Sequence, residues 1–163
     1  MNATKKIITR IEADPKKKAA NAELSILRTA AYCRVSTDSS DQLESYKAQV
    51  AYYTDAIAKN PKWRFAGIYA DEGLSGTQAA KRDDFLRMIK DCEKGKIDYI
   101  ITKSVARFAR NTVDALKYVR KLKALGIGVY FEEQCLDSLK SESELALGIY
   151  SVLAQAESEN ISA

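Results

Sequence analysis

The apolar positions of this chain alternate between short compact runs and longer segments with helical spacing. Four compact runs predict β-strands, at residues 27–35, 63–70, 97–103 and 127–133. Between them, three segments carry apolar or aromatic side chains every three or four positions and predict helices, at residues 41–59, 83–95 and 112–126. Gly95 and Gly126 close the last two segments and predict the carboxyl ends of those helices.

Regular alternation of strand and helix predicts an α/β fold. Parallel strands joined by right-handed crossovers give a mainly parallel sheet of four to five strands with helices on both faces. Ligands on such sheets bind at the carboxyl ends of the strands. Ser36, Asp71 and residues 103–110 all follow predicted strand ends, so they are candidates for a functional site.

The two ends of the chain differ from the middle. Residues 1–24 are polar, include three consecutive lysines, and are expected to be a flexible basic extension before an α/β domain at 25–140. Residues 141–163 open with a capping box and are expected to continue as one helix. Its apolar stripe, which either its own sheet or a partner subunit must cover, consists of Leu145, Ile149, Val152, Leu153 and Ala156.

Composition narrows the chemistry. The chain has 26 basic and 22 acidic residues and a net charge of +4, which is compatible with a polyanionic partner without indicating one. No apolar run is long enough for a membrane span or signal peptide, so we expect a cytoplasmic protein. Three cysteines far apart suggest reduced thiols. Histidine is absent, which excludes Ser-His-Asp hydrolysis and histidine-ligated metals.

Arginines accompany one serine at a strand end. Strand alternation places Arg34 and Ser36 on the same side of the chain. Arg107 and Arg110 are spaced i, i+3 and point the same way if this stretch begins a helix. A guanidinium group can bind two oxygens of one phosphate through two hydrogen bonds, and it stays protonated. A cluster of arginines therefore suits phosphoryl transfer. Spacing alone leaves open that Ser36 only caps a strand and that the arginines are solvated.

Several blocks of the sequence resemble the serine recombinase catalytic domain of the resolvase and invertase superfamily. They are "YCRVSTDSSDQ", "YADEGLSGTQAAKRDDFLRMI", "KSVARFARN" and "VLAQAESENIS", in that order between about Thr29 and Ser162. The forms "YCRVSTD" and "RFARN" are most similar to the large serine recombinases of mobile elements and phages. The resemblance implies a site-specific DNA recombinase, in which a serine attacks double-stranded DNA and forms a 5′-phosphoserine link without a metal ion, ATP or another cofactor.

The resemblance also implies roles for individual residues. Ser36 falls on the nucleophile, and the phosphate ligands fall on Arg34, Arg82, Arg107 and Arg110. Asp71 and Gln49 fall on orienting positions, and Lys103 is expected to contact DNA together with the arginines. In the family the long terminal helix forms the interface between identical subunits. The resemblance therefore implies a homo-oligomer, a dimer that becomes a tetramer in the synaptic complex. The residues expected there are Leu145, Ile149, Val152, Leu153 and Glu157.

One departure from the family concerns proton transfer. Small resolvases carry an aspartate where this chain has Ala106, so the general base is left open. Target recognition in the family comes from later segments, and we therefore expect the chain to be a catalytic fragment of a longer recombinase. Two other interpretations compete with this one. The chain could be an α/β module that senses phosphate or a nucleotide without catalysis, or an oligomerisation module.

Overall fold

The computed structural model of the chain describes residues 25–36, 41–73, 82–109 and 111–140, together with residues 146, 148, 149, 152 and 156. The expected basic extension at 1–24 lies outside the described residues. The elements, in chain order, are β1 (Leu27–Ser36), α2 (Asp41–Lys59), β2 (Trp63–Gly73), α3 (Asp83–Glu93), β3 (Tyr99–Thr102), α4 (Val105–Phe108), α5 (Thr112–Ala124), β4 (Gly128–Phe131) and β5 (Leu136–Asp137). Each of the four predicted strands and three predicted helices is present.

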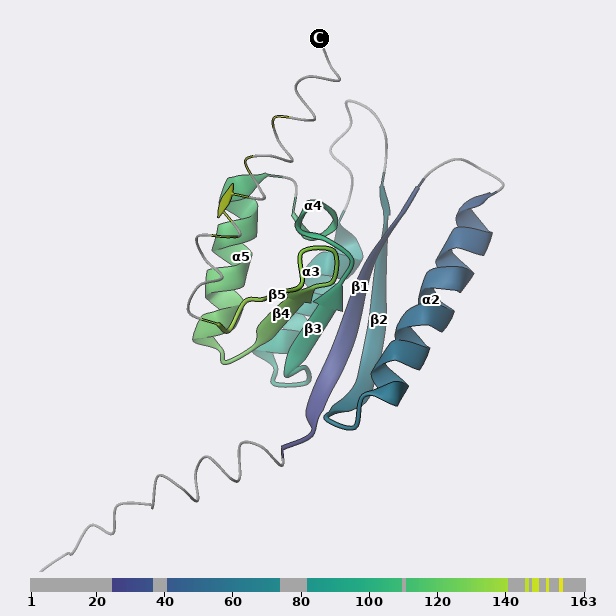
Figure 1. Ribbon diagram of the computed structural model, residues 1–163, viewed down its shortest axis with the longest axis horizontal. Coiled ribbons are helices and arrows are strands. Elements are labelled where there is room, and N and C mark those ends of the chain that lie inside the picture. Colours follow the sequence, from purple (N-terminus) through teal and green to yellow (C-terminus); the bar gives the residue numbers. More distant parts are fainter. Residues whose placement is uncertain are drawn as a thin grey trace, which may run out of the picture.

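The strands form one five-stranded sheet in the order β2-β1-β3-β4-β5. The first four strands run parallel, and β5 pairs with β4 antiparallel. After β2 has paired with one side of β1, the chain crosses over and β3 pairs with the other side (Figure 1). The strand order therefore reverses at β1, and the α/β fold with a mainly parallel sheet is confirmed. Such a reversal opens a crevice at the carboxyl ends of the two strands.

The end of β2 differs from the prediction. The strand continues to Gly73 because its last residues pair with the end of β1, where Gly73 lies opposite Ser36 and Asp71 lies opposite Arg34. Asp71 therefore belongs to a strand and not to a loop. Strand alternation therefore fixes the direction of its side chain.

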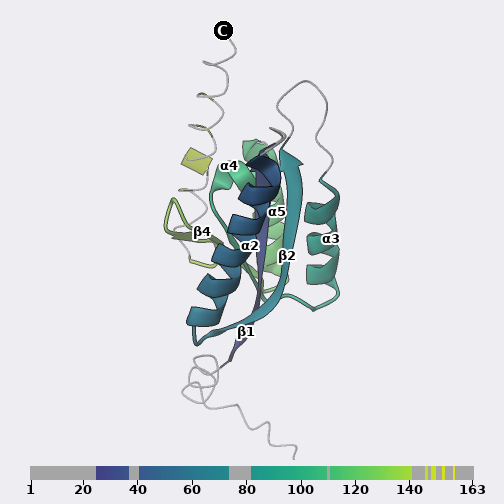
Figure 2. The same cartoon turned by 90° about the vertical axis from the view of Figure 1, so that its right-hand side faces the viewer.

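Helices cover both faces of the sheet, as Figure 2 shows for α2 and α3 on opposite sides. On one face, Tyr53 and Ile57 of α2 pack against Ala31, Cys33 and Ile101. On the other face, α3 and α5 bury the larger core, which includes Phe85, Met88, Ile89, Val119 and Leu122. Gly95 and Gly126 have φ angles of 72° and 76°, so both predicted helix ends are confirmed at glycines in the left-handed region.

The short helix α4 between β3 and α5 is held by one aromatic side chain. Phe108 is fully buried, and its ring packs edge-on against Tyr32, Phe85 and Phe131 with centroid distances of 6.5, 5.2 and 5.5 Å. The helix ends there, because Ala109 has extended dihedral angles of −136° and 154°. The i, i+3 spacing of Arg107 and Arg110 would place them on one helix, but α4 ends before Arg110. Arg110 itself lies outside the described residues.

Little of the expected terminal helix is described. Ile149 and Val152 are helical and 53% and 57% exposed. Leu145, Leu153 and Glu157, the other residues expected at the interface, lie outside the described residues. A long interface helix is therefore still a prediction.

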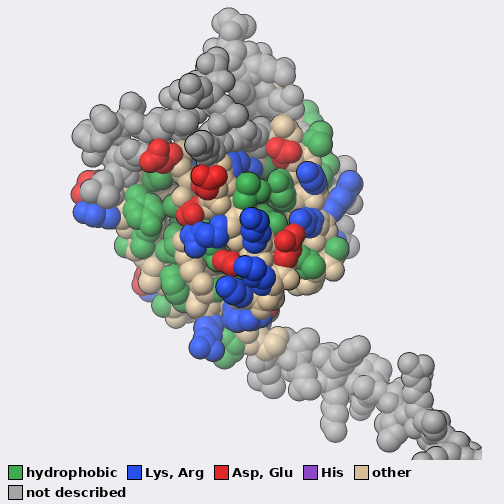
Figure 3. All heavy atoms as spheres, turned by 180° about the vertical axis from the view of Figure 1, so that it is seen from behind, with side chains coloured by type: hydrophobic (Ala, Val, Ile, Leu, Met, Phe, Trp, Pro, Cys, Tyr) green, Lys and Arg blue, Asp and Glu red, His purple; other side chains and the backbone are tan. Residues whose placement is uncertain are grey.

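The surface on the α3 side carries charges of both signs. Figure 3 shows Lys and Arg side chains with Asp and Glu side chains between them. Lys121 of α5 pairs with Glu93 of α3 at 2.5 Å, and Arg87 pairs with Asp84 at 3.2 Å. The small basic excess is thus spread over a mixed surface here. Among the described residues, no helix combines the length and apolar character needed to cross a membrane.

Candidate active site

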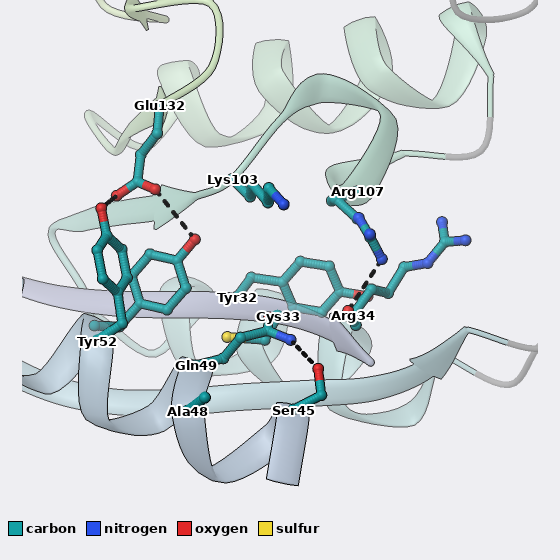
Figure 4. A pocket seen from close by; sticks show the side chains of 11 residues that line it. Tyr32, Cys33, Arg34, Ser45, Ala48, Gln49, Tyr52, Lys103, Arg107 and Glu132 are labelled. Atoms are coloured by element: carbon teal, nitrogen blue, oxygen red, sulfur yellow. Dashed lines mark hydrogen bonds between the residues drawn. The ribbon is translucent and has the colours of Figure 1, made fainter. Parts of the chain in front are cut away.

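A cavity of about 460 Å³ lies at the carboxyl edge of the sheet, between α2 and the ends of β1 and β3 (Figure 4). This is the place where the strand order reverses. Four of the predicted site residues line it, each from a different segment: Arg34 at the end of β1, Gln49 on α2, Lys103 after β3 and Arg107 on α4. The structure thus brings Arg34, Lys103 and Arg107 from two strand ends together, with Gln49 of α2 beside them.

Two arginines at the cavity each donate to a backbone oxygen at or next to the other. Arg107 Nη1 donates to the backbone oxygen of Arg34 at 3.2 Å, and Arg34 Nη1 donates to the backbone oxygen of Ala106 at 3.4 Å. The two contacts join α4 to the end of β1. A guanidinium has five N–H donors, so Arg107 can hold the backbone oxygen of Arg34 and also donate to an anion.

The position of Arg107 is set by the start of α4. Ser104 Oγ accepts from the backbone N–H of Arg107 at 3.3 Å, and Gln134 Oε1 accepts from that of Val105 at 3.3 Å. These side chains satisfy amide groups that the first turn of a helix leaves without intrahelical partners. With Phe108 buried beside it, Arg107 therefore extends from a well-fixed backbone.

Ser36 is the last residue of β1, two residues beyond Arg34. Its backbone lies opposite Gly73 in the sheet. Its side chain lies outside the described part of the chain, as does the whole of Arg110. The structure thus places the backbone of the predicted nucleophile at a strand end, next to Arg34 and Arg107.

Asp71 was expected to orient groups in the site, but it does not line the cavity. Its carboxylate is buried and accepts from the backbone N–H groups of Asp84 and Phe85, both at 2.9 Å, at the start of α3. It also accepts from the hydroxyl of Tyr32 at 3.0 Å. Burial raises the pKa of Tyr32 to about 12, so the tyrosine is a neutral donor at pH 7. Asp71 therefore fixes α3 against the strand that ends in Ser36.

Arg82 also lies apart from the cavity. Its guanidinium sits 3.7 Å from the ring centroid of Phe85 and donates through Nη2 to the backbone oxygen of Phe108. Its Nε is buried and has no hydrogen-bond partner among the described residues. The structure thus places Arg82 behind α4, against the same aromatic cluster that holds Arg107.

Gln49 and Lys103 lie on opposite walls of the cavity. The Gln49 amide donates to Ser45 Oγ at 3.4 Å, one helical turn away. Lys103 Nζ is 3.8 Å from Glu133 Oε1, an exposed ion pair that is worth little and leaves the ammonium accessible. Both side chains could reach a ligand in the cavity without breaking a buried interaction.

The sequence interpretation missed a carboxylate and two tyrosines that line the cavity. Tyr52 and Tyr53 donate their hydroxyls to Glu132, to Oε1 at 3.3 Å and Oε2 at 3.4 Å. Burial raises the pKa of Glu132, whereas the two hydroxyls and Lys103 oppose that shift. Two signals could have found these residues. Glu132 directly follows a strand, and the cavity-facing residues of α2 repeat at helical spacing, at 45, 48, 49, 52 and 53.

The described donors suit an anion better than a metal ion. Arg34, Lys103 and Arg107 contribute cations to one cavity. No group of three or more Cys, Asp or Glu residues that could hold a metal occurs among the described residues. Cys33 lines the cavity, but burial raises the pKa of its thiol to about 12, so it is not a thiolate at neutral pH.

Comparisons with known proteins point to one family. The sequence pattern of the resolvase N-terminal domain matches residues 29–163. The transposon Tn3 resolvase of Escherichia coli is 27% identical over 135 residues, which are 83% of this chain and 66% of that protein. The chain thus spans just under two thirds of the length of that relative.

Solved structures agree. The N-terminal catalytic domain of TP901-1 integrase is 26% identical, with a TM-score of 0.56 over 81% of this chain and 97% of that chain. A resolvase family site-specific recombinase from Streptococcus pneumoniae is 29% identical, with a TM-score of 0.57 over 83% and 91%. Since the family pattern covers most of the sequence and the fold agrees, the chain belongs to the resolvase N-terminal domain family of serine recombinases.

Proposed function

We propose that the chain is the catalytic domain of a site-specific DNA recombinase and that Ser36 is its nucleophile. The observation that carries the proposal is the pair of reciprocal contacts between Arg34 and α4, directly beside the end of the strand that terminates in Ser36. A phosphodiester bound by Arg34 and Arg107 would lie next to this strand end. Lys103, on the same cavity, would contact a neighbouring phosphate.

The reaction exchanges one phosphate ester for another. Ser36 Oγ forms a bond to phosphorus, and the bond from phosphorus to the 3′ oxygen breaks. The serine proton leaves to an acceptor that we do not assign, and the departing 3′ oxygen takes up a proton and becomes a hydroxyl. Attack of a 3′-hydroxyl on the phosphoserine reverses these steps and rejoins DNA. Bond energy is retained in the covalent link, so no ATP or other cofactor is required.

Arginines supply the stabilisation that this reaction needs. Negative charge grows on the phosphate oxygens in the transition state, and donors already in place there are worth roughly 3 kcal/mol each. We assign Arg34 and Arg107 to this role from their position at the cavity, and Arg110 from its place in the family motif. Asp71 and Arg82 are proposed as positioning residues, because they contact Tyr32, Phe85 and Phe108 behind the site.

Recombination joins two DNA duplexes, so we further propose that the protein acts as a homo-oligomer, as a dimer and as a tetramer when two sites are paired. The exposed apolar side chains of Ile149 and Val152 support a contact along the terminal helix. DNA integration, excision or transposition of a mobile element would follow from such strand exchange.

A covalent protein–DNA adduct tests the proposal. Nicked duplexes that trap the cleaved strand, drawn from a library of random central sequences, are incubated with the protein and separated under denaturing conditions. The wild type should form an adduct whose modified residue, identified by peptide mass spectrometry, is Ser36. Ser36→Ala should form none, while Ser39→Ala, in the same stretch of sequence, should still react. An adduct formed by Ser36→Ala, or the lack of any wild-type adduct across the library, refutes the assignment.

A further inference from the structure

Helix α2 is anchored unevenly. Tyr53 and Ile57, in its second half, are 3% and 0% exposed and pack into the core. From residue 44 to residue 52, no described side chain is buried. This amino-terminal part instead forms a wall of the cavity, through Ser45, Gln49 and Tyr52 among others. Apolar packing therefore fixes one end of α2 far more firmly than the end that faces the candidate site.

One carboxylate ties α2 to the sheet at the boundary between these two parts. Glu132 directly follows β4 and accepts hydroxyl hydrogen bonds from both Tyr52 and Tyr53 (Figure 4). The two tyrosines pack edge to face, with ring centroids 5.0 Å apart. Tyr53 lies in the core and Tyr52 is 56% exposed, so the contact connects the anchored part of the helix with the exposed part.

The ionised form of Glu132 suits this contact best. A carboxylate receives both hydroxyls in charge-assisted hydrogen bonds, whereas a neutral carboxyl makes only weaker, neutral hydrogen bonds to the same tyrosines. The groups that face Glu132 are Tyr52 and Tyr53 on α2, Cys33 on β1 and Lys103 after β3, with Glu133 beside it in the chain. Burial opposes ionisation and only part of this is offset by the hydroxyls and Lys103. The carboxylate is therefore held at a cost in folding stability.

We propose that Glu132 is a positioning residue whose ionised form holds the amino-terminal half of α2 over the cavity, so that DNA cleavage depends on its protonation state. This rests on the proposed function of the same site. Gln49 lies one turn before the two tyrosines on the same helix, so a shift of this part of α2 would displace it as well. Only four residues separate Ser36 from the start of α2, so a shift of this helix end also acts on the strand end that carries Ser36.

Hydrogen exchange tests the structural half of the proposal without DNA. Protection factors of amides at 44–52 are measured by mass spectrometry at several pH values, each corrected for intrinsic exchange. In the wild type they should fall as Glu132 becomes protonated. In Glu132→Gln they should be lower by about threefold to tenfold at neutral pH and independent of protonation, because the hydrogen bonds to a neutral amide lack the charge of the carboxylate. Glu133→Gln, which removes the neighbouring exposed carboxylate, should keep the wild-type pH response, shifted to lower pH because Glu133 raises the pKa of Glu132.

The rate of adduct formation tests the coupling to chemistry. Glu132→Gln should form the adduct about tenfold more slowly at neutral pH. In the wild type the rate should fall toward acid pH, and in the variant this fall should be smaller because protonation of Glu132 no longer contributes to it. Tyr52→Phe removes one exposed hydroxyl without endangering the fold and should show part of both effects. Unchanged protection at 44–52, or an unchanged pH profile beside altered protection, overturns the proposal. If no variant and no wild type forms an adduct, the proposed function fails, while the exchange data still decide whether Glu132 holds α2.

Discussion

Arg107 donates a guanidinium hydrogen bond to the backbone oxygen of Arg34, 3.2 Å away, and so closes α4 onto the end of β1. Arg34 returns a bond to Ala106, the residue before Arg107. The side chains proposed to bind phosphate are therefore also the ones that fix their own spacing. Substituting either one should affect the geometry of the other.

Arg107→Lys should be almost as damaging to cleavage as Arg107→Ala. Lysine keeps the charge but lacks the planar fork that can hold the Arg34 carbonyl and a phosphate at the same time. We expect adduct formation to slow by about 10²–10³-fold in both variants, by analogy with the loss of one transition-state donor. Single-turnover adduct kinetics measure this. Arg64→Lys, at an exposed position on β2, should keep the wild-type rate, and a fully active Arg107→Lys would contradict the assignment.

Asp71→Ala should destabilise the fold as well as lower activity. The substitution leaves the backbone N–H groups of Asp84 and Phe85 without their acceptor and strands the Tyr32 hydroxyl. Loss of a cap and a buried hydrogen bond predicts a decrease in the free energy of unfolding of about 2–3 kcal/mol.

Urea denaturation measures this decrease, and Tyr32→Phe offers a matched control. That variant removes only the hydroxyl contact and keeps the aromatic packing, so its loss should be about 1 kcal/mol. If Asp71→Ala left stability unchanged while abolishing cleavage, Asp71 would be a ligand of the substrate rather than a cap for α3.

The sequence predicted the fold well because each large element has its own repeating pattern. Two parts lacked such a signal. The strand β5 has only two residues, too few for any periodicity. The helix α4 ends after four residues because Phe108 turns into the aromatic core, a tertiary contact that local spacing does not contain.

The site was predicted in part for a similar reason. The rule that ligands bind at strand ends identifies an edge of the sheet but not a face. Gln49 and Lys103 line the cavity beside α2, whereas Asp71 points toward α3 on the opposite face. Glu132 was missed because a carboxylate was not expected beside groups chosen to bind phosphate. Glu132 accepts hydrogen bonds from two tyrosines of α2, and this tertiary contact cannot be read from the sequence.

The three cysteines should differ sharply in reactivity. Burial raises the pKa of both Cys33 and Cys92 to about 12, while Cys135 is exposed. Since the thiolate is the nucleophile, iodoacetamide at neutral pH should modify Cys135 first, with the other two protected until the protein unfolds. Peptide mass spectrometry over time measures the order. Rapid labelling of Cys33 in the folded protein would mean that the cavity opens far more than the described packing allows.

Glu132→Gln should make the protein more stable at high pH even though it slows cleavage. Burial raises the pKa of Glu132 in the folded state, so the protonated form favours folding. That contribution is fully present below the pKa in the unfolded chain, about 4.3, and is lost as the pH rises through the folded-state pKa. Glutamine has no such proton to lose. The free energy of unfolding of the variant relative to the wild type should therefore rise with pH across this window and level off above it.

Urea denaturation at closely spaced pH values measures that difference, and Tyr52→Phe provides an internal check on its cause. The Tyr52 hydroxyl lowers the folded-state pKa of Glu132, so its removal should extend the window to higher pH. A difference that is flat or falls with pH would mean that the hydroxyl bonds and Lys103 outweigh burial. If Glu132→Gln is more stable than the wild type and also cleaves more slowly, the Glu132 carboxylate serves to position α2. It does not then serve to stabilise the fold.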